Sequence, residues 1–188
     1  MNILLIDNGT SRLTKLYDLL KGNKTTTIEF GKINSINIEN FDLIILSGSK
    51  HISVIGNEHL YKNEIDIIKN TNKPIIGICL GFELIGYAYG VELLKMEKKE
   101  KGIIKLLVSE PNSIFSGLPN FQVYEAHRWV IKKTPDDFIE LARSKDGVEA
   151  IKHKSRKLYG FQFHPEMFVE KTCGDEIFKN TLEVLNKN

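Results

Sequence analysis

The chain has 188 residues, of which 41% are hydrophobic and 27% are charged, so its composition is globular and excludes a disordered or fibrous protein. With 26 basic and 24 acidic side chains, the formal net charge is +2, which predicts neither a nucleic-acid nor a membrane partner. The apolar runs are too short to span a bilayer. Two cysteines are too few for a disulfide framework, and the start MNILLIDNG has no basic head of a signal peptide. We therefore expect a cytoplasmic protein with reduced thiols.

The first half of the chain alternates short apolar runs with segments of helical periodicity. We expect strands at 2–7, 25–30, 43–47 and 74–78, and helices at 10–21, 61–69 and 82–89. Nearly continuous apolar strands that alternate with helices are typical of a parallel sheet covered on both faces. This pattern predicts an open α/β sheet.

The second half contains short strand patterns with few helices between them. We expect strands at 103–108, 121–123, 129–131, 138–142, 148–152 and 158–163, followed by a helix at 175–185. These strands are interpreted as an antiparallel extension of the sheet. Because no repeat or linker interrupts the pattern, we expect one α/β domain over 1–188, an open and mostly parallel sheet flanked by helices.

The segment 77–83, GICLGFE, lies where the last apolar strand of the first half meets a helix. Glycines two residues before and after Cys79 allow a tight turn that presents the thiol, as in a nucleophile elbow. A helix that starts at Leu80 points N–H groups at the sulfur, so we expect the thiolate to be favoured. A lone cysteine in an apolar run is more often structural, but this setting favours a nucleophile. Cys173 lies in a polar loop and is interpreted as incidental.

A cysteine nucleophile needs a base, and the base needs an orienting partner. His164 ends the apolar strand pattern YGFQF, and Glu166 follows two residues later across Pro165. On an extended segment, residues i and i+2 point the same way, and proline stiffens the link between them. The pattern predicts a Cys79–His164–Glu166 triad.

Together these motifs resemble the class I (triad) glutamine amidotransferases. GICLGFE is followed about 85 residues later by FQFHPE, and ILLIDNG, LIILSGS and AHRWV lie in the matching order. The resemblance covers essentially the whole chain and implies a flavodoxin-like fold. It also implies a glutaminase that releases ammonia from glutamine for a partner synthase.

Carried over to this sequence, the resemblance implies Cys79 as nucleophile, His164 as base and acid, and Glu166 as orienter. The oxyanion donors would be the backbone N–H of Leu80 and of the loop after LIILS. That loop is Ser47-Gly48-Ser49-Lys50, where the family usually has Ser-Gly-Gly-Pro or Pro-Gly-Pro-Gly, so the second donor falls at Gly48 or Ser49. A serine resists a positive φ more than glycine does.

The substrate-binding positions depart from the family pattern. Phe82 and Glu83 replace a His-Gln or Met-Gln pair, whose glutamine contacts the bound substrate. An ionised Glu83 cannot donate a hydrogen bond and would repel a substrate carboxylate. Around His127, the positions that hold the α-amino and α-carboxylate groups correspond to Ala126, Arg128 and Trp129, although the last two side chains are equally consistent with surface packing.

Within the family, GVEAIKHK at 147–154, which leads into YGFQFHPE, most resembles the stand-alone glutaminase subunit of archaeal-type GMP synthetase. Glutaminases of anthranilate and aminodeoxychorismate synthases resemble it less. The sequence continues only about twenty residues past the triad, so we expect the ammonia acceptor to be a separate polypeptide. The resemblance to the GMP enzyme implies an ATP-pyrophosphatase-type synthetase.

The expected chemistry is acyl transfer to sulfur, with no metal and no organic cofactor, because zinc-type spacings and phosphate-binding loops are absent from the sequence. Three alternatives stay open here. Glu83 favours a γ-glutamyl hydrolase that acts on an amide or conjugate. Phe82, Glu83 and Ser49 together favour a catalytically weak regulatory protein. A chance triad on an α/β domain is the third.

Overall fold

The computed structural model describes residues 1–118 and 120–187, so Pro119 and Asn188 of the expected domain lie outside the described residues. Its larger sheet has eight strands in the order β2-β1-β3-β4-β10-β9-β8-β6. Their bounds are β1 Asn2–Asp7, β2 Lys24–Glu29, β3 Leu43–Leu46, β4 Ile75–Ile78, β6 Leu107–Val108, β8 Phe138–Arg143, β9 Val148–His153 and β10 Leu158–Phe161. Short 3-10 helices occupy Phe30–Ser35, Ile38–Asn40, Glu58–Tyr61 and Ser113–Phe115.

The parallel part of the sheet includes one strand from the second half of the chain. Strands β2, β1, β3, β4 and β10 pair in parallel, and only β9, β8 and β6 continue the sheet antiparallel. The expected α/β class is confirmed, but the expectation that 158–163 belongs to the antiparallel extension is wrong. Since β10 lies in register beside β4, the chain that follows each strand emerges at the same edge of the sheet.

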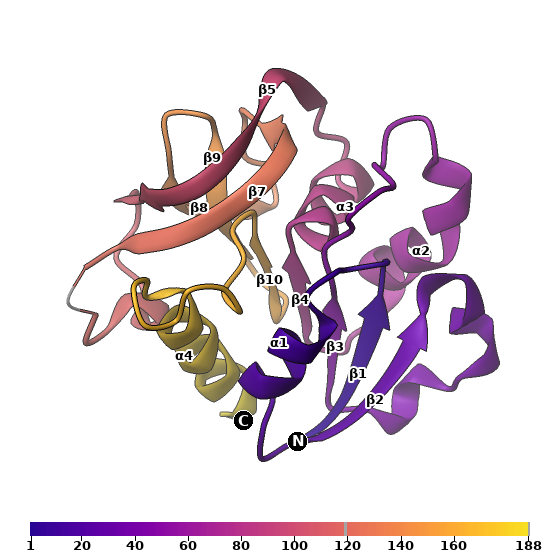
Figure 1. Ribbon diagram of the computed structural model, residues 1–188. Coiled ribbons are helices and arrows are strands. Elements are labelled where there is room, and N and C mark those ends of the chain that lie inside the picture. The colour runs from indigo at the N-terminus through magenta and orange to yellow at the C-terminus, as the bar shows by residue number, and fades with distance from the viewer. Residues whose placement is uncertain (119, 188) are drawn as a thin grey trace.

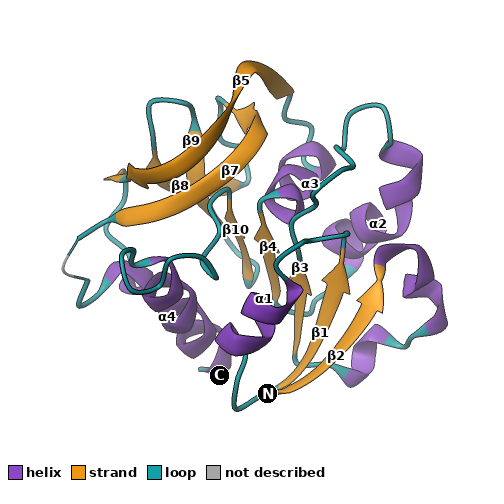
Figure 2. Ribbon diagram, viewed as in Figure 1, coloured by secondary structure: helices purple, strands orange, loops and turns teal. Residues whose placement is uncertain are grey.

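Two pairs of helices cover the two faces of this sheet (Figures 1 and 2). Helices α1 (Leu13–Leu19) and α4 (Gly174–Asn186) pack on the side of Ile3 and Leu5, whereas α2 (Lys62–Asn70) and α3 (Leu80–Ala88) pack on the side of Leu4 and Ile6. This alternation along one strand is the period-two pattern of a sheet that is buried on both faces. Among the described residues, no helix is long and apolar enough to cross a membrane.

The second, two-stranded sheet was not expected. Strands β5 (Leu93–Lys105) and β7 (Gln122–Ile131) pair antiparallel and form an arch beside the main sheet (Figure 1). The segments expected as separate strands at 121–123 and 129–131 are one continuous strand, and most of β5 has no apolar alternation because its residues are largely exposed. The arch lies over the edge where β4 and β10 end, so it supplies one wall of the site described below.

A buried polar cluster joins the chain after β1 to the chain after β3. The Asn8 N–H donates to Ser47 Oγ (2.9 Å), and Asn8 Nδ2 donates to the Ser47 carbonyl (3.1 Å) and to Glu64 Oε1 (3.0 Å). Glu64 is fully buried on α2. Burial raises the pKa of Glu64 from 4.5 to about 8, although the hydrogen bond from Asn8 opposes this.

This pKa predicts a stability that depends on pH. A carboxyl whose pKa rises on folding contributes stability below its unfolded pKa of 4.5, and this contribution is lost as the pH rises through about 8. Glu64→Gln keeps an acceptor for Asn8 but carries no charge. We expect the excess of this variant over the wild type in free energy of unfolding, measured by urea unfolding, to grow by about 3 kcal/mol between pH 5.5 and pH 9. The exposed replacement Glu183→Gln is the matched control. An equal difference at both pH values would contradict the role of Glu64.

Candidate active site

Cys79 stands between the end of β4 and the first residue of α3, with φ 52° and ψ −102°. A residue with a side chain rarely adopts this backbone conformation, and such strain persists only where the surroundings impose it. Here the Cys79 N–H donates to the Phe161 carbonyl at the end of β10 (2.7 Å), and the Cys79 carbonyl accepts from the Glu83 N–H (3.0 Å). The sharp strand-to-helix turn expected from the sequence is present, and the helix starts at Leu80 as expected.

The two glycines around Cys79 are required by close packing. A Cβ on Gly77 would lie 2.5 Å from the Gly81 carbonyl oxygen, and a Cβ on Gly81 would overlap the Leu46 carbonyl oxygen. Neither backbone group can move without disrupting β3 or α3. The turn therefore requires the Gly-x-Cys-x-Gly pattern, because three backbone segments are in contact there and leave no room for a Cβ at either glycine.

His164 and Glu166 form the expected hydrogen-bonded pair. Nδ1–H of His164 donates to Glu166 Oε1 at 2.8 Å, and both side chains are buried. The His164 N–H donates to the Tyr124 carbonyl (2.8 Å), so β7 fixes the backbone of this segment. Since Nδ1 carries the proton that Glu166 accepts, the neutral ring has its lone pair on Nε2.

Gly48 lies between Cys79 and His164. A Cβ built on Gly48 would lie 3.3 Å from Cys79 Cβ and 3.2 Å from His164 Cε1. Both side chains thus pack against Gly48 from opposite motifs of the sequence. The structure therefore brings together the cysteine of one motif and the histidine of the other. Only a residue without a side chain leaves both in place.

The electrostatic surroundings hold the Cys79 thiol in its protonated form. Burial raises the pKa of Cys79 well above its ordinary value, and the nearby carboxyl groups of Glu83 and Glu166 raise it further. The Arg12 guanidinium and the Leu80 N–H lower it, but they do not compensate. The Leu80 N–H at the helix start favours the thiolate as expected, but desolvation exceeds this contribution and leaves the pKa of the thiol raised.

Arg12 is a site residue that the sequence interpretation missed. Its Nη1 lies 3.3 Å from His164 Nε2, and its guanidinium lies 5.7 Å from the centre of the Tyr124 ring. Arg12 follows the carboxyl end of β1, and these ends meet at one edge in a parallel sheet, so its position in the chain was a usable signal. In this arrangement, Arg12 donates to the lone pair on Nε2 of the histidine.

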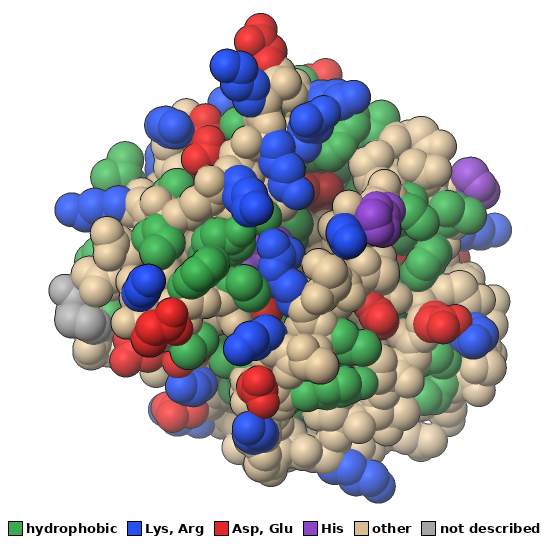
Figure 3. Space-filling model, viewed as in Figure 1, with side chains coloured by type: hydrophobic (Ala, Val, Ile, Leu, Met, Phe, Trp, Pro, Cys, Tyr) green, Lys and Arg blue, Asp and Glu red, His purple; other side chains and the backbone are tan. Residues whose placement is uncertain are grey.

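A cavity of about 370 Å³ opens beside the thiol. Its wall includes Ser49 of the expected oxyanion loop. Five more residues expected at the site also line it, namely Leu80, Glu83, Ala126, Arg128 and Trp129. Lining residues that the sequence interpretation did not assign include Lys50, His51, Lys95, Lys99 and His127. In Figure 3, Lys and Arg side chains gather on the upper half of the face shown, over β5 and β7. The cavity is therefore bordered by cations, whereas Glu83 lies among its buried residues.

Two departures from the family pattern have a structural explanation. The fully buried Phe82 packs on Gly160 of β10, where an added Cβ would lie 2.8 Å from the ring. Among the described residues, a positive φ outside glycine occurs at Cys79 and Phe168, so Ser49 fits its loop without strain. Its Oγ accepts from the Ile52 N–H (3.2 Å) and so stabilises the loop. Phe82 and Ser49 thus leave the geometry of the site intact.

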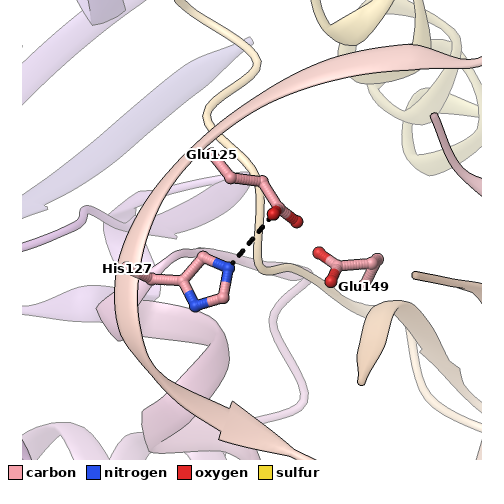
Figure 4. Close-up of side chains that lie close together, drawn as sticks. All are labelled: Glu125, His127 and Glu149. Atoms are coloured by element: carbon pink, nitrogen blue, oxygen red, sulfur yellow. Dashed lines mark ion pairs between the residues drawn. The ribbon is translucent and has the colours of Figure 1, made fainter. Parts of the chain in front are cut away.

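Three buried side chains, Glu125, His127 and Glu149, form a charge cluster (Figure 4), and His127 connects it to the cavity that it lines. His127 Nδ1 donates to the Trp129 carbonyl (3.0 Å), which directs Nε2 toward Glu125 Oε2 at 3.3 Å. On the other side, Glu149 Oε1 accepts from Ser144 Oγ (2.7 Å). The sequence offered one signal for this cluster, which is a charged residue two positions before His127 in a buried strand.

The pKa directions of these groups favour a neutral cluster, with one proton on Glu149 and an imidazolium at His127. Burial and the facing Glu125 carboxylate raise the pKa of Glu149 well above its ordinary value. Burial also opposes ionisation of Glu125, but the neighbouring Glu149 and His127 lower its pKa overall. Burial would lower the pKa of His127, yet Glu125 and Glu83 raise it on balance. A protonated Glu149, an ionised Glu125 and a His127 imidazolium therefore sum to zero charge.

The comparisons with known proteins agree with this geometry. The family model for glutamine amidotransferase class-I matches residues 4–184. The chain belongs to the class I glutamine amidotransferases. A glutamine-hydrolysing GMP synthase subunit from Methanocaldococcus jannaschii is 37% identical, over 97% of this chain and 96% of its own. The protein of the same description from Methanobrevibacter smithii is 33% identical over 100% and 97%.

Solved structures of this family have the same fold. A structure from Thermoplasma acidophilum, described as a putative GMP synthase subunit, superposes with a TM-score of 0.87 at 30% identity, covering 98% of this chain and 94% of the other. A glutamine amidotransferase from Thermotoga maritima, at 16% identity over 100% and 99% of the two chains, has a TM-score of 0.83 and so shares the fold. The present chain therefore has the fold of these two structures over its described residues.

The position of Gly48 predicts a sharp effect of a single methyl group. Gly48→Ala places a Cβ against both Cys79 and His164, so the two side chains must separate. We expect glutamine hydrolysis to fall by about tenfold or more while the fold is retained, because small displacements of reacting groups are costly. The matched control is Gly31→Ala, whose added Cβ meets nothing within 4 Å. Equal activity of the two variants would contradict this geometry.

Proposed function

We propose that this chain is the glutaminase subunit of a two-subunit GMP synthetase, which hydrolyses L-glutamine to glutamate and ammonia. The observation that carries the proposal is the position of the Cys79 thiol. It lies on a strained turn beside a substrate-sized cavity. The Cys79 side chain and the ring of His164 both pack against Gly48, and His164 is hydrogen-bonded to Glu166. This arrangement suits acyl transfer to sulfur.

In the first step, the proton of the Cys79 thiol passes to His164 Nε2 and the sulfur attacks the γ-carboxamide carbon of glutamine. Because burial holds the resting thiol protonated, this transfer accompanies attack rather than preceding it. Arg12 donates to the same lone pair, so its guanidinium must move aside before Nε2 accepts the proton. Glu166 keeps the ring in the tautomer that accepts at Nε2.

The second step releases ammonia. The tetrahedral oxyanion receives hydrogen bonds from the backbone N–H of Leu80 and of the Gly48–Ser49 loop, the two segments that flank the thiol. His164 gives its proton to the departing nitrogen, and the C–N bond breaks to leave a γ-glutamyl thioester on Cys79. His164 then takes a proton from the water that attacks the thioester, and it returns this proton to the sulfur as the C–S bond breaks and glutamate leaves. Substrate contacts come from Glu83, Ala126, Arg128 and Trp129, which line the cavity.

The ammonia acceptor is a separate synthetase polypeptide, and we infer the ATP-pyrophosphatase type. Support comes from relatives that cover nearly the whole chain and are named as a glutamine-hydrolysing subunit of GMP synthase. The same names do not favour a γ-glutamyl hydrolase or a purely regulatory protein. Both cysteines are buried and unpaired, which suits a reducing compartment, so we infer that the protein acts in the cytoplasm.

The proposed nucleophile is tested by paired cysteine variants. Cys79→Ala removes the sulfur that forms the thioester, and we expect glutamine hydrolysis to be abolished while folding and synthetase binding are retained. Cys173 is also buried, with its Sγ 3.2 Å from the Gln122 carbonyl, but it lies outside the cavity, so Cys173→Ala should keep turnover. Ammonia release by the complex is the measurement. Turnover by Cys79→Ala would refute the mechanism.

The proposed partner is tested by purification of the tagged chain from its native cells. We expect an ATP-pyrophosphatase-type synthetase to co-purify, and the complex to form GMP with glutamine as the nitrogen donor. Because ammonia must pass between the subunits, free ammonia should replace glutamine in the Cys79→Ala complex. Recovery of a chorismate-binding enzyme instead would contradict the assignment to GMP synthesis.

A further inference from the structure

Glu83 is the buried acid nearest in sequence to Cys79 in the cavity. It lies four residues after Cys79, one turn along α3, and its side chain is 4% exposed. Gln162 Nε2 donates to Glu83 Oε1 at 3.3 Å. The side chain thus sits at the inner end of the cavity with one oxygen accepting from a neutral amide, and no cation of the described residues forms an ion pair with it.

The groups that face Glu83 come from several elements. His127 on β7 and Tyr61 on the 3-10 helix before α2 interact electrostatically with its charge. Lys50, Lys95 and Lys99 share the cavity with it, toward the solvent. Burial raises the pKa of Glu83 to about 7, and the hydrogen bond from Gln162 and the charge of His127 prevent a larger rise.

The reaction places negative charge close to this acid. Thiolate character on Cys79 and the oxyanion of the tetrahedral intermediate both develop within one helical turn of Glu83, in a buried region of low dielectric. An ionised Glu83 already raises the pKa of the Cys79 thiol. Ionised Glu83 therefore opposes every anionic species on the pathway, whereas protonated Glu83 does not.

We propose that Glu83 must be protonated for glutamine hydrolysis, so that this carboxyl group acts as a proton-controlled specificity residue of the cavity. The inference rests on the proposed glutaminase function and adds its regulation. A protonated carboxyl has one donor and one acceptor, the same pattern that a glutamine side chain presents at one end of its amide. The proton thus gives Glu83 the hydrogen-bonding capacity that a carboxylate lacks, and it removes the repulsion of a substrate carboxylate.

Comparison of Glu83→Gln with the wild type across the pH range tests the proposal. The ratio of their kcat/KM values for glutamine cancels the ionisation of groups that the two proteins share. We expect similar values near pH 6 and a wild type that falls behind the variant by about tenfold at pH 8, since its protonated fraction declines above about pH 7. The measurement uses the chain co-purified with its synthetase, and Glu183→Gln on the exposed side of α4 is the matched control, with a constant ratio.

Three outcomes would overturn the inference. A wild-type to Glu83→Gln ratio that stays constant with pH means that the proton on Glu83 is irrelevant. A variant that loses activity mainly at high pH means that ionised Glu83 binds the substrate ammonium group instead. If no protein hydrolyses glutamine at any pH, the proposed function fails and this inference fails with it, whereas the first two outcomes leave the proposed function standing. If Glu83→Gln does not fold, the wild type alone is used. Its kcat/KM for glutamine, divided by the rate at which iodoacetamide alkylates Cys79, must then fall above about pH 7.

Discussion

The strained backbone of Cys79 is the constraint on which the site depends. Its positive φ is imposed by β4 on one side, by α3 on the other and by the Phe161 carbonyl of β10, which accepts its N–H. Strain of this kind costs about 1–3 kcal/mol, and the contacts of three packed elements offset it. The same parallel pairing that supplies this carbonyl carries His164 to the edge where the thiol emerges, so the proposed nucleophile and its proposed base are positioned by one set of backbone interactions.

Electrostatics around the thiol favour a resting enzyme. Glu83 lines the cavity and Glu166 accepts from His164, and burial together with the charges of these two acids keeps Cys79 protonated. Arg12 meanwhile donates to His164 Nε2. In the proposed mechanism the thiol loses its proton to His164 Nε2 only as it attacks bound substrate, so the sulfur is not permanently ionised.

The features that were predicted correctly from the sequence are those formed by residues close together in the chain. The apolar strands of the first half, the glycines around Cys79 and the hydrogen bond between His164 and Glu166 all follow from residues near each other in the chain. The parallel pairing of β10, the long charged strand β5 and the position of Arg12 depend on tertiary contacts, which periodicity does not encode. The protonated thiol was missed for a similar reason, since desolvation depends on what packs above the turn.

In the proposed mechanism one sulfur atom, that of Cys79, carries the reaction. The most direct measurement treats the complex with a diazo-ketone analogue of glutamine and maps the modified peptide by mass spectrometry while residual turnover is followed. We expect one adduct per chain, on Cys79, formed in step with the loss of glutamine hydrolysis and prevented by glutamine. Turnover that persists after Cys79 is fully modified, or inactivation that accompanies an adduct at another residue, would contradict it.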